Sequence, residues 1–68
     1  MSAAEESLER AQALLDQIEV VREELEALGD DADPDTVLEI VGRLSELAKE
    51  VEAELARAKR EAESDARP

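Results

Sequence analysis

The sequence predicts an all-α fold, a coiled-coil-like antiparallel hairpin of two helices. We expect oligomerisation or a partner chain to complete it into a bundle. Apolar residues recur at steps of three and four along residues 3–28 and again along residues 34–63, which is the spacing of one helix face. Gly29 and Pro34 mark the break between the two segments. The chain has 68 residues and no cysteine or histidine, so neither a disulfide nor a zinc site supplements its small core.

The first helix is predicted at about residues 3–28. Ser2 and Glu5 form a Ser-x-x-Glu capping box at its start. Gly29 is expected to end it in the left-handed conformation. Its apolar stripe consists of Leu8, Ala11, Leu14, Leu15, Ile18, Val21, Leu25 and Leu28. The adjacent leucines widen the stripe beyond a narrow seam, and a wide stripe is typical of a helix with two neighbours in a bundle.

The second helix is predicted at about residues 34–63, after a turn at 29–33. Asp33 is expected to cap it, and Pro34 suits its first position because the missing N–H leaves no hydrogen bond unmade there. Its apolar stripe consists of Val37, Ile40, Val41, Leu44, Leu47, Ala48, Val51, Leu55, Ala58 and Ala62. Residues 64–68 are expected to fray. Together, residues 1–63 form one helical-hairpin domain.

The short turn makes the helices antiparallel neighbours and sets their register. Residues whose numbers add up to about 64 should lie side by side. This arithmetic places Glu54, a polar residue on the second stripe, opposite Arg10. It also places the basic segment 57–60 beside the acidic residues Glu5, Glu6 and Glu9 of helix 1. The predicted apolar pairs are Leu25 with Ile40, Ile18 with Leu47, Leu14 with Val51, and Leu8 with Leu55.

The charge of the chain excludes several classes of partner. Twenty acidic and eight basic side chains give a net charge of −12. Such a chain repels phosphate backbones and anionic lipid, so we expect no direct contact with nucleic acid or membrane. The sequence shows neither an apolar run of membrane-spanning length nor a secretion leader, which makes the cytoplasm the expected location.

No residue pattern predicts catalysis. Without histidine the serines lack their usual activating base, and a hairpin offers no cleft to separate the pKa values of two carboxyl groups. Asp31-x-Asp33-x-Asp35 imitates the start of a calcium loop, but Thr36 and Gly42 occupy the positions that need glycine and glutamate. Helix capping explains these acids instead. We therefore expect no catalytic residue, no metal, no cofactor and no small-molecule ligand.

Two residues interrupt the stripes. Arg22 stands where an apolar side chain is expected, and Gly42 lies inside the second helix, where glycine costs about 1 kcal/mol relative to alanine. One interpretation makes Arg22 a specificity contact and Gly42 a point of close helix approach. The preferred interpretation is that Arg22 extends into water and that Gly42 is a tolerated surface residue.

The chain resembles the small subunit of exodeoxyribonuclease VII. The resemblance covers about residues 11–62. It lies in Leu15-x-x-Ile18-x-x-Val21-x-x-x-Leu25-Glu26, in Pro34 and Leu38, and in Leu47-Ala48-x-x-Val51-x-x-x-Leu55-x-x-Ala58. The turn is longer and more acidic than is usual in that family, and the family's aromatic residue of helix 2 is missing. The resemblance implies a helical hairpin without an active site, several copies of which pack along helices of a large subunit that degrades single-stranded DNA.

The predicted function is therefore an interface. The expected interface residues are Leu8, Leu14, Leu15, Ile18, Val21, Leu25, Leu28, Val37, Ile40, Val41, Leu44, Leu47, Val51 and Leu55. The first hypothesis is a non-catalytic accessory subunit of a larger enzyme, with the exonuclease as the specific case. The alternative is a homo-oligomeric helical bundle that serves as a scaffold or adaptor. A third hypothesis is an acidic regulator that binds a basic protein.

Overall fold

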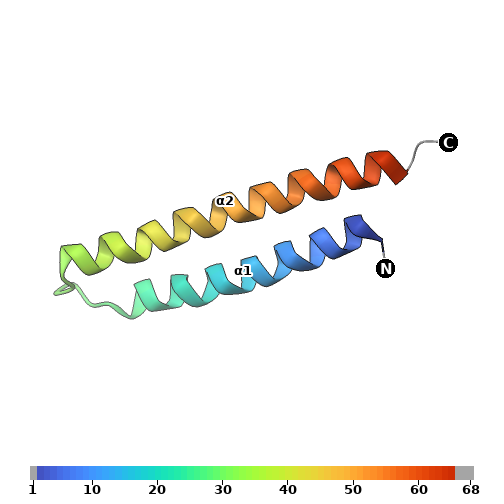
Figure 1. The fold of residues 1–68 in the computed structure, drawn as a ribbon. Coiled ribbons are helices and arrows are strands. Elements are labelled where there is room, and N and C mark those ends of the chain that lie inside the picture. The colour runs from blue at the N-terminus through green and yellow to red at the C-terminus, as the bar shows by residue number, and fades with distance from the viewer. Residues whose placement is uncertain (1, 66–68) are drawn as a thin grey trace.

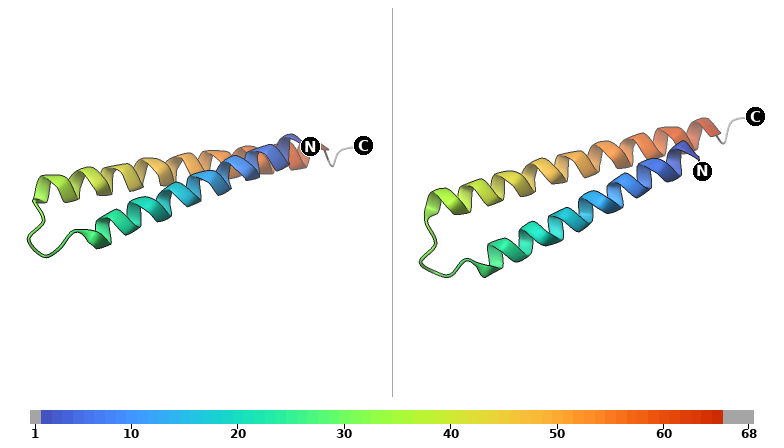
Figure 2. Two further views of the ribbon diagram at one scale, coloured as in Figure 1. Left: turned by 90° about the horizontal axis from the view of Figure 1, so that it is seen from below. Right: turned by 60° about the horizontal axis from the view of Figure 1, so that its bottom comes forward.

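Two antiparallel helices make up the fold of the computed structural model, which describes residues 2–65 and the side chains of residues 2–64. Helix α1 spans Ala3–Ala27 and helix α2 spans Pro34–Asp65. They lie side by side, with the turn at one end and both termini at the other (Figure 1, Figure 2). The molecule measures 59 × 16 × 10 Å and has a radius of gyration of 16.0 Å, against about 11 Å for a compact domain of this length. The hairpin is therefore a rod with an unusually large surface for its mass.

The start of each helix is held by the residue that the sequence predicts. The Ser2 Oγ accepts a hydrogen bond of 3.1 Å from the Glu5 amide, as a capping box requires. The returning bond differs from that motif, because the Glu5 carboxylate accepts from the Ser2 hydroxyl rather than from its backbone N–H. The Asp33 carboxylate accepts from the Asp35 amide at 3.3 Å and so caps α2. An acid of the calcium-like sequence thus serves as a helix cap.

The end of α1 differs from the prediction. Leu28 leaves the helix in an extended conformation, φ −71° and ψ 130°, and its N–H donates to the Leu25 carbonyl. No glycine of the described chain has a positive φ, so the expectation that Gly29 ends the helix in the left-handed conformation is wrong. The turn is closed instead by a 3.1 Å hydrogen bond from the Ala32 N–H to the Gly29 carbonyl. The side chain of the extended Leu28 is half-buried. The helix therefore ends without a left-handed residue.

The helices pack along a strict seven-residue repeat, which we call the seam. Apart from Thr36 at the start of α2, the buried and half-buried positions of each helix follow one another in steps of three and four, as in a coiled coil. On α1 the seam consists of Ala4, Ser7, Ala11, Leu14, Ile18, Val21, Leu25 and Leu28, and on α2 of Val37, Ile40, Leu44, Leu47, Val51, Glu54, Ala58 and Glu61. An ion pair of 3.1 Å joins Arg10 to Glu54 and confirms their predicted juxtaposition.

The seam corrects the predicted stripes in two respects. It is narrower than predicted, since Leu8, Leu15, Val41 and Leu55 remain about half exposed. Near the termini it is also more polar, because Ser7 takes the place that was assigned to Leu8. The reason is geometric: stepping back by sevens from Leu28 along the helix leads to Ser7.

The far end of α2 extends beyond the prediction. Ser64 and Asp65 are still helical, so α2 ends two residues beyond the predicted bound of about residue 63. Residues 66–68 of the predicted tail lie outside the described residues. Neither helix is long and apolar enough to cross a membrane, over the part of the chain that the structure describes.

Replacing Gly42 with alanine is expected to stabilise the hairpin by about 1 kcal/mol. A Cβ atom added at Gly42 meets no atom within 4 Å, so the alanine restricts the unfolded chain without a clash. Thermal melting followed by circular dichroism should show a rise of about 4–8 °C. Gly29→Ala, which also meets no atom but lies outside the helices, serves as the control and should change the melting temperature much less. An unchanged or lower melting temperature for Gly42→Ala would contradict this account.

Candidate protein-interaction surface

Four large apolar side chains form a second, unpaired row beside the seam. Each of them directly follows a seam residue, and each is exposed by between 46% and 51%. We call this row the apolar flank; it consists of Leu8 and Leu15 on α1 and of Val41 and Leu55 on α2. The members on one helix are seven or fourteen residues apart, and Ala48 lies midway between the two on α2. In an antiparallel pair, positions that follow the seam in this way fall on the same side of both helices.

The opposite side of the hairpin is polar and carries two ion pairs between the helices. Arg43 donates to Glu24 at 3.0 Å, and Arg10 donates to Glu54 at 3.1 Å. We call this side the salt-bridged flank. Charged side chains at such positions set the register of a coiled coil without adding much to its stability. The charged side chains of these ion pairs therefore find their partners within the chain, whereas the side chains of the apolar flank remain partly in water.

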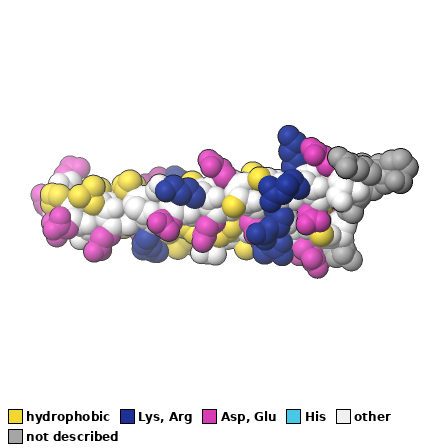
Figure 3. Space-filling view, turned by 45° about the horizontal axis from the view of Figure 1, so that its top comes forward, with side chains coloured by type: hydrophobic (Ala, Val, Ile, Leu, Met, Phe, Trp, Pro, Cys, Tyr) yellow, Lys and Arg dark blue, Asp and Glu magenta, His cyan; other side chains and the backbone are white. Residues whose placement is uncertain are grey.

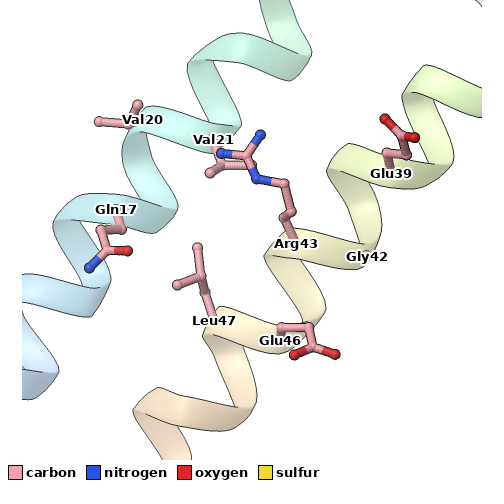
Figure 4. A pocket seen from close by; sticks show the side chains of 8 residues that line it. All are labelled: Gln17, Val20, Val21, Glu39, Gly42, Arg43, Glu46 and Leu47. Atoms are coloured by element: carbon pink, nitrogen blue, oxygen red, sulfur yellow. The ribbon is translucent and has the colours of Figure 1, made fainter.

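Two open grooves lie along the salt-bridged flank. The larger is about 640 Å³ and is lined by Gln17, Val20, Val21, Glu39, Gly42, Arg43, Glu46 and Leu47. In Figure 4, Arg43 extends from α2 towards α1, and Leu47 points into the space between the helices. The smaller groove is about 400 Å³, and its lining includes Arg10 and Glu54. The least exposed charged side chain of these linings is Glu54, which is 14% exposed and already paired with Arg10 and Arg57. Among the described residues no three or more carboxylates gather closely enough to hold a metal ion.

The seam becomes polar towards the termini, which the sequence analysis recognised only at Glu54. The Glu54 side chain is 14% exposed and accepts hydrogen bonds from both Arg10 and Arg57. Ser7 is fully buried, and its Oγ accepts a 3.0 Å hydrogen bond from Arg10. Arg57 therefore contacts Glu54 on its own helix, whereas the prediction placed its segment beside the acids of α1. A strict seven-residue count from Leu14 would have found Ser7.

Arg22 lies outside the seam and extends into water, in agreement with the preferred interpretation. Its guanidinium donates to the carboxylates of Glu19 and Glu26 on the same helix. The hydrogen bond from Arg22 lowers the pKa of the Glu19 carboxyl from its ordinary value, and the same bond raises the pKa of Arg22. The three side chains are more than half exposed, so their pairing adds little to stability. A Cβ atom added at Gly42 would meet no atom within 4 Å, so Gly42 is not needed for a close approach of the helices.

Acidic side chains border the apolar flank on the α1 side. They are exposed and consist of Glu5, Glu9, Asp16, Glu19, Glu23 and Glu26; we call this row the acidic edge. On the face that Figure 3 shows, basic side chains gather near the end of the rod that carries the termini. Arg22 is the one base among the residues from Glu19 to Glu26. The potential beside the apolar flank is consequently negative along α1.

The structure divides the fourteen predicted interface residues into two groups. Ten of them belong to the seam and pack within the chain, namely Leu14, Ile18, Val21, Leu25, Leu28, Val37, Ile40, Leu44, Leu47 and Val51. The remaining four are the apolar flank. The sequence analysis missed Leu38 as an interface candidate, although at 68% it is the most exposed large apolar residue. Leu38 follows the seam residue Val37, but the positions seven residues before and after it are Asp31 and Ser45, so it gave no periodic signal.

Comparisons of the chain with protein-family models, with curated proteins and with solved structures found no match.

Proposed function

We propose that this chain is a non-catalytic interaction subunit that docks onto another protein chain through its apolar flank. The apolar flank carries this proposal. Leu8, Leu15, Val41 and Leu55 keep about half of their surface in water although the seam beside them is already closed. The two helices bury one apolar stripe, the seam, against each other and leave a second, parallel stripe exposed. This is the pattern of a helical bundle that lacks one of its helices.

Energetics favours the same function. Covering the exposed half of a leucine side chain contributes about 1 kcal/mol, so the four residues together supply about 3–4 kcal/mol on docking. A hairpin of 68 residues without a disulfide or a metal has little stability to spare. Docking would therefore stabilise the fold as well as assemble the complex.

The specific case that we propose is the accessory small subunit of a multisubunit exonuclease that acts on single-stranded DNA. Its support is the resemblance along residues 11–62, which includes Leu15 and Leu55 of the apolar flank. The net charge of −12 fits a subunit that contacts the protein partner and leaves the nucleic acid to it.

Affinity isolation from the native cells tests the proposal. The tagged wild-type chain is compared with the double variant Leu15→Gln, Leu55→Gln and with the control Val20→Gln, which removes an equally exposed residue outside the apolar flank. We expect one larger protein to accompany the wild type and the control in fixed stoichiometry and to be lost with the double variant. A set of accompanying proteins that does not depend on Leu15 and Leu55 would contradict the docking role. A complex without any nuclease subunit, from cells that express one, would contradict only the specific case.

A further inference from the structure

We infer that the apolar flank receives a basic amphipathic helix, one whose apolar stripe is bordered by lysine or arginine. This inference rests on the proposed docking role and adds the chemistry of the partner. Three properties of the hairpin define that chemistry: the spacing of the apolar flank, the charge beside it, and the cost of covering it with a second copy of the chain.

The spacing fits a helix. Leu8 and Leu15 on α1 and Val41 and Leu55 on α2 repeat at multiples of seven residues, which is the repeat of a coiled-coil partner. From Val41 to Leu55 the row extends for about 21 Å at 1.5 Å per residue, or about four helical turns of the partner. Ala48, with its small side chain, lies at the middle of the row, where a third helix can approach closely. A helix laid along the apolar flank would thus meet apolar side chains from both α1 and α2.

The charge beside the row selects a basic partner. The acidic edge provides six exposed carboxylates along α1, from Glu5 to Glu26. Two of them, Glu19 and Glu26, pair with Arg22, which takes the next place in the row seven residues after Leu15. The corresponding border on α2 is close to neutral, since Lys49 and Lys59 offset Glu52 and Glu63. Complementary charge at the rim of an interface speeds association and fixes orientation. The partner's basic residues would therefore lie mainly along the edge that faces α1.

A second copy of the chain fits the apolar flank less well. If two copies packed face to face with their turns at opposite ends, α1 would lie on α1 and the acidic edge would meet itself. If the turns lay at the same end, Asp30, Asp31, Asp33 and Asp35 of both copies would gather there. Either arrangement brings two chains of net charge −12 together with like charges adjacent. Like-charge juxtaposition is the usual means by which interfaces reject a wrong partner.

A synthetic helix tests the inference directly. The probe is a helical peptide of about three heptads. It carries leucine at the two apolar positions of each heptad, lysine at the positions beside them and one tryptophan at its end. Because this chain has no tryptophan or tyrosine, the fluorescence of that tryptophan reports the peptide alone. We expect binding to the wild-type chain at low salt, weakening as salt rises, and no binding of the same peptide with glutamate in place of lysine.

Matched variants locate the binding. Leu15→Gln should weaken binding by about tenfold, while Val20→Gln on the other side changes it by less than about twofold. The pair Asp16→Asn, Glu23→Gln on the acidic edge should weaken binding more than the pair Glu39→Gln, Glu46→Gln, which removes the same charge from the salt-bridged flank. Circular dichroism at 222 nm checks that each variant keeps its helices.

Three results would overturn the inference. Equal binding of the lysine and glutamate peptides would exclude a basic partner. Equal weakening by both pairs of charge variants would mean attraction to the net charge alone. A dimer in sedimentation equilibrium that Leu15→Gln disperses would make a second copy the occupant. The affinity isolation from native cells tests the proposed function separately. A protein partner that is recovered only when Leu15 and Leu55 are intact would support the docking role even if the basic-helix inference fails.

Discussion

Val21→Asp is expected to unfold the hairpin, whereas Val20→Asp, one residue away, should leave it folded. Val21 is 3% exposed in the seam, and Val20 is 54% exposed. An aspartate at position 21 would bury a carboxylate with no partner or would be protonated, and both outcomes cost about 4 kcal/mol or more. A small domain without a disulfide or metal has only about 3–5 kcal/mol of total stability.

Circular dichroism at 222 nm and urea titration measure the difference. We expect Val20→Asp to shift the urea midpoint only slightly, because Val20 is exposed at the wall of an open groove and an aspartate there would stay in water. Val21→Asp should abolish the cooperative transition or move it to very low urea. Similar midpoints for the two variants would show that the seam is not the stabilising contact of the chain.

Glu54→Leu is expected to raise the stability of the hairpin by about 1–2 kcal/mol, or the melting temperature by about 5–10 °C. Glu54 lies in the seam with a side-chain exposure of 14%, next in register to the small, buried Ala11 and Ala58. Leucine would fill this part of the seam and bury apolar surface. The half-exposed Arg10 and Arg57 would turn from Glu54 to water at little cost.

The control for this prediction is Glu52→Leu, the same replacement at an exposed position of α2. It should change the melting temperature by much less, because its side chain gains no buried contact. A loss of stability in Glu54→Leu would mean that the ion pairs with Arg10 and Arg57 contribute more than packing does. Glu54→Ala, which removes the same pairs without filling the seam, would then destabilise the hairpin to a similar degree.

The terminal half of the seam shows why the sequence pattern was misread there. Counting apolar residues assigns Leu8 and Leu55 to the core, because both are large and lie at helical steps from true core residues. Two helices that pack along a seven-residue repeat share one stripe, however, and its direction is set by the apolar majority in the half near the turn. Continued to the termini, that stripe passes through Ser7 and Glu54 and leaves the leucines at its side.

The sequence by itself determined the two helices, their caps at Ser2 and Asp33, their antiparallel pairing, and the register that brings Arg10 to Glu54. These follow from local hydrogen bonding and from the apolar period, which act within a few residues along the chain. Only the tertiary structure decided which apolar residues the helices bury against each other and which they leave in water. That division depends on the angle at which one helix faces the other. A stripe two residues wide, as at Leu14 and Leu15, is compatible with more than one such angle.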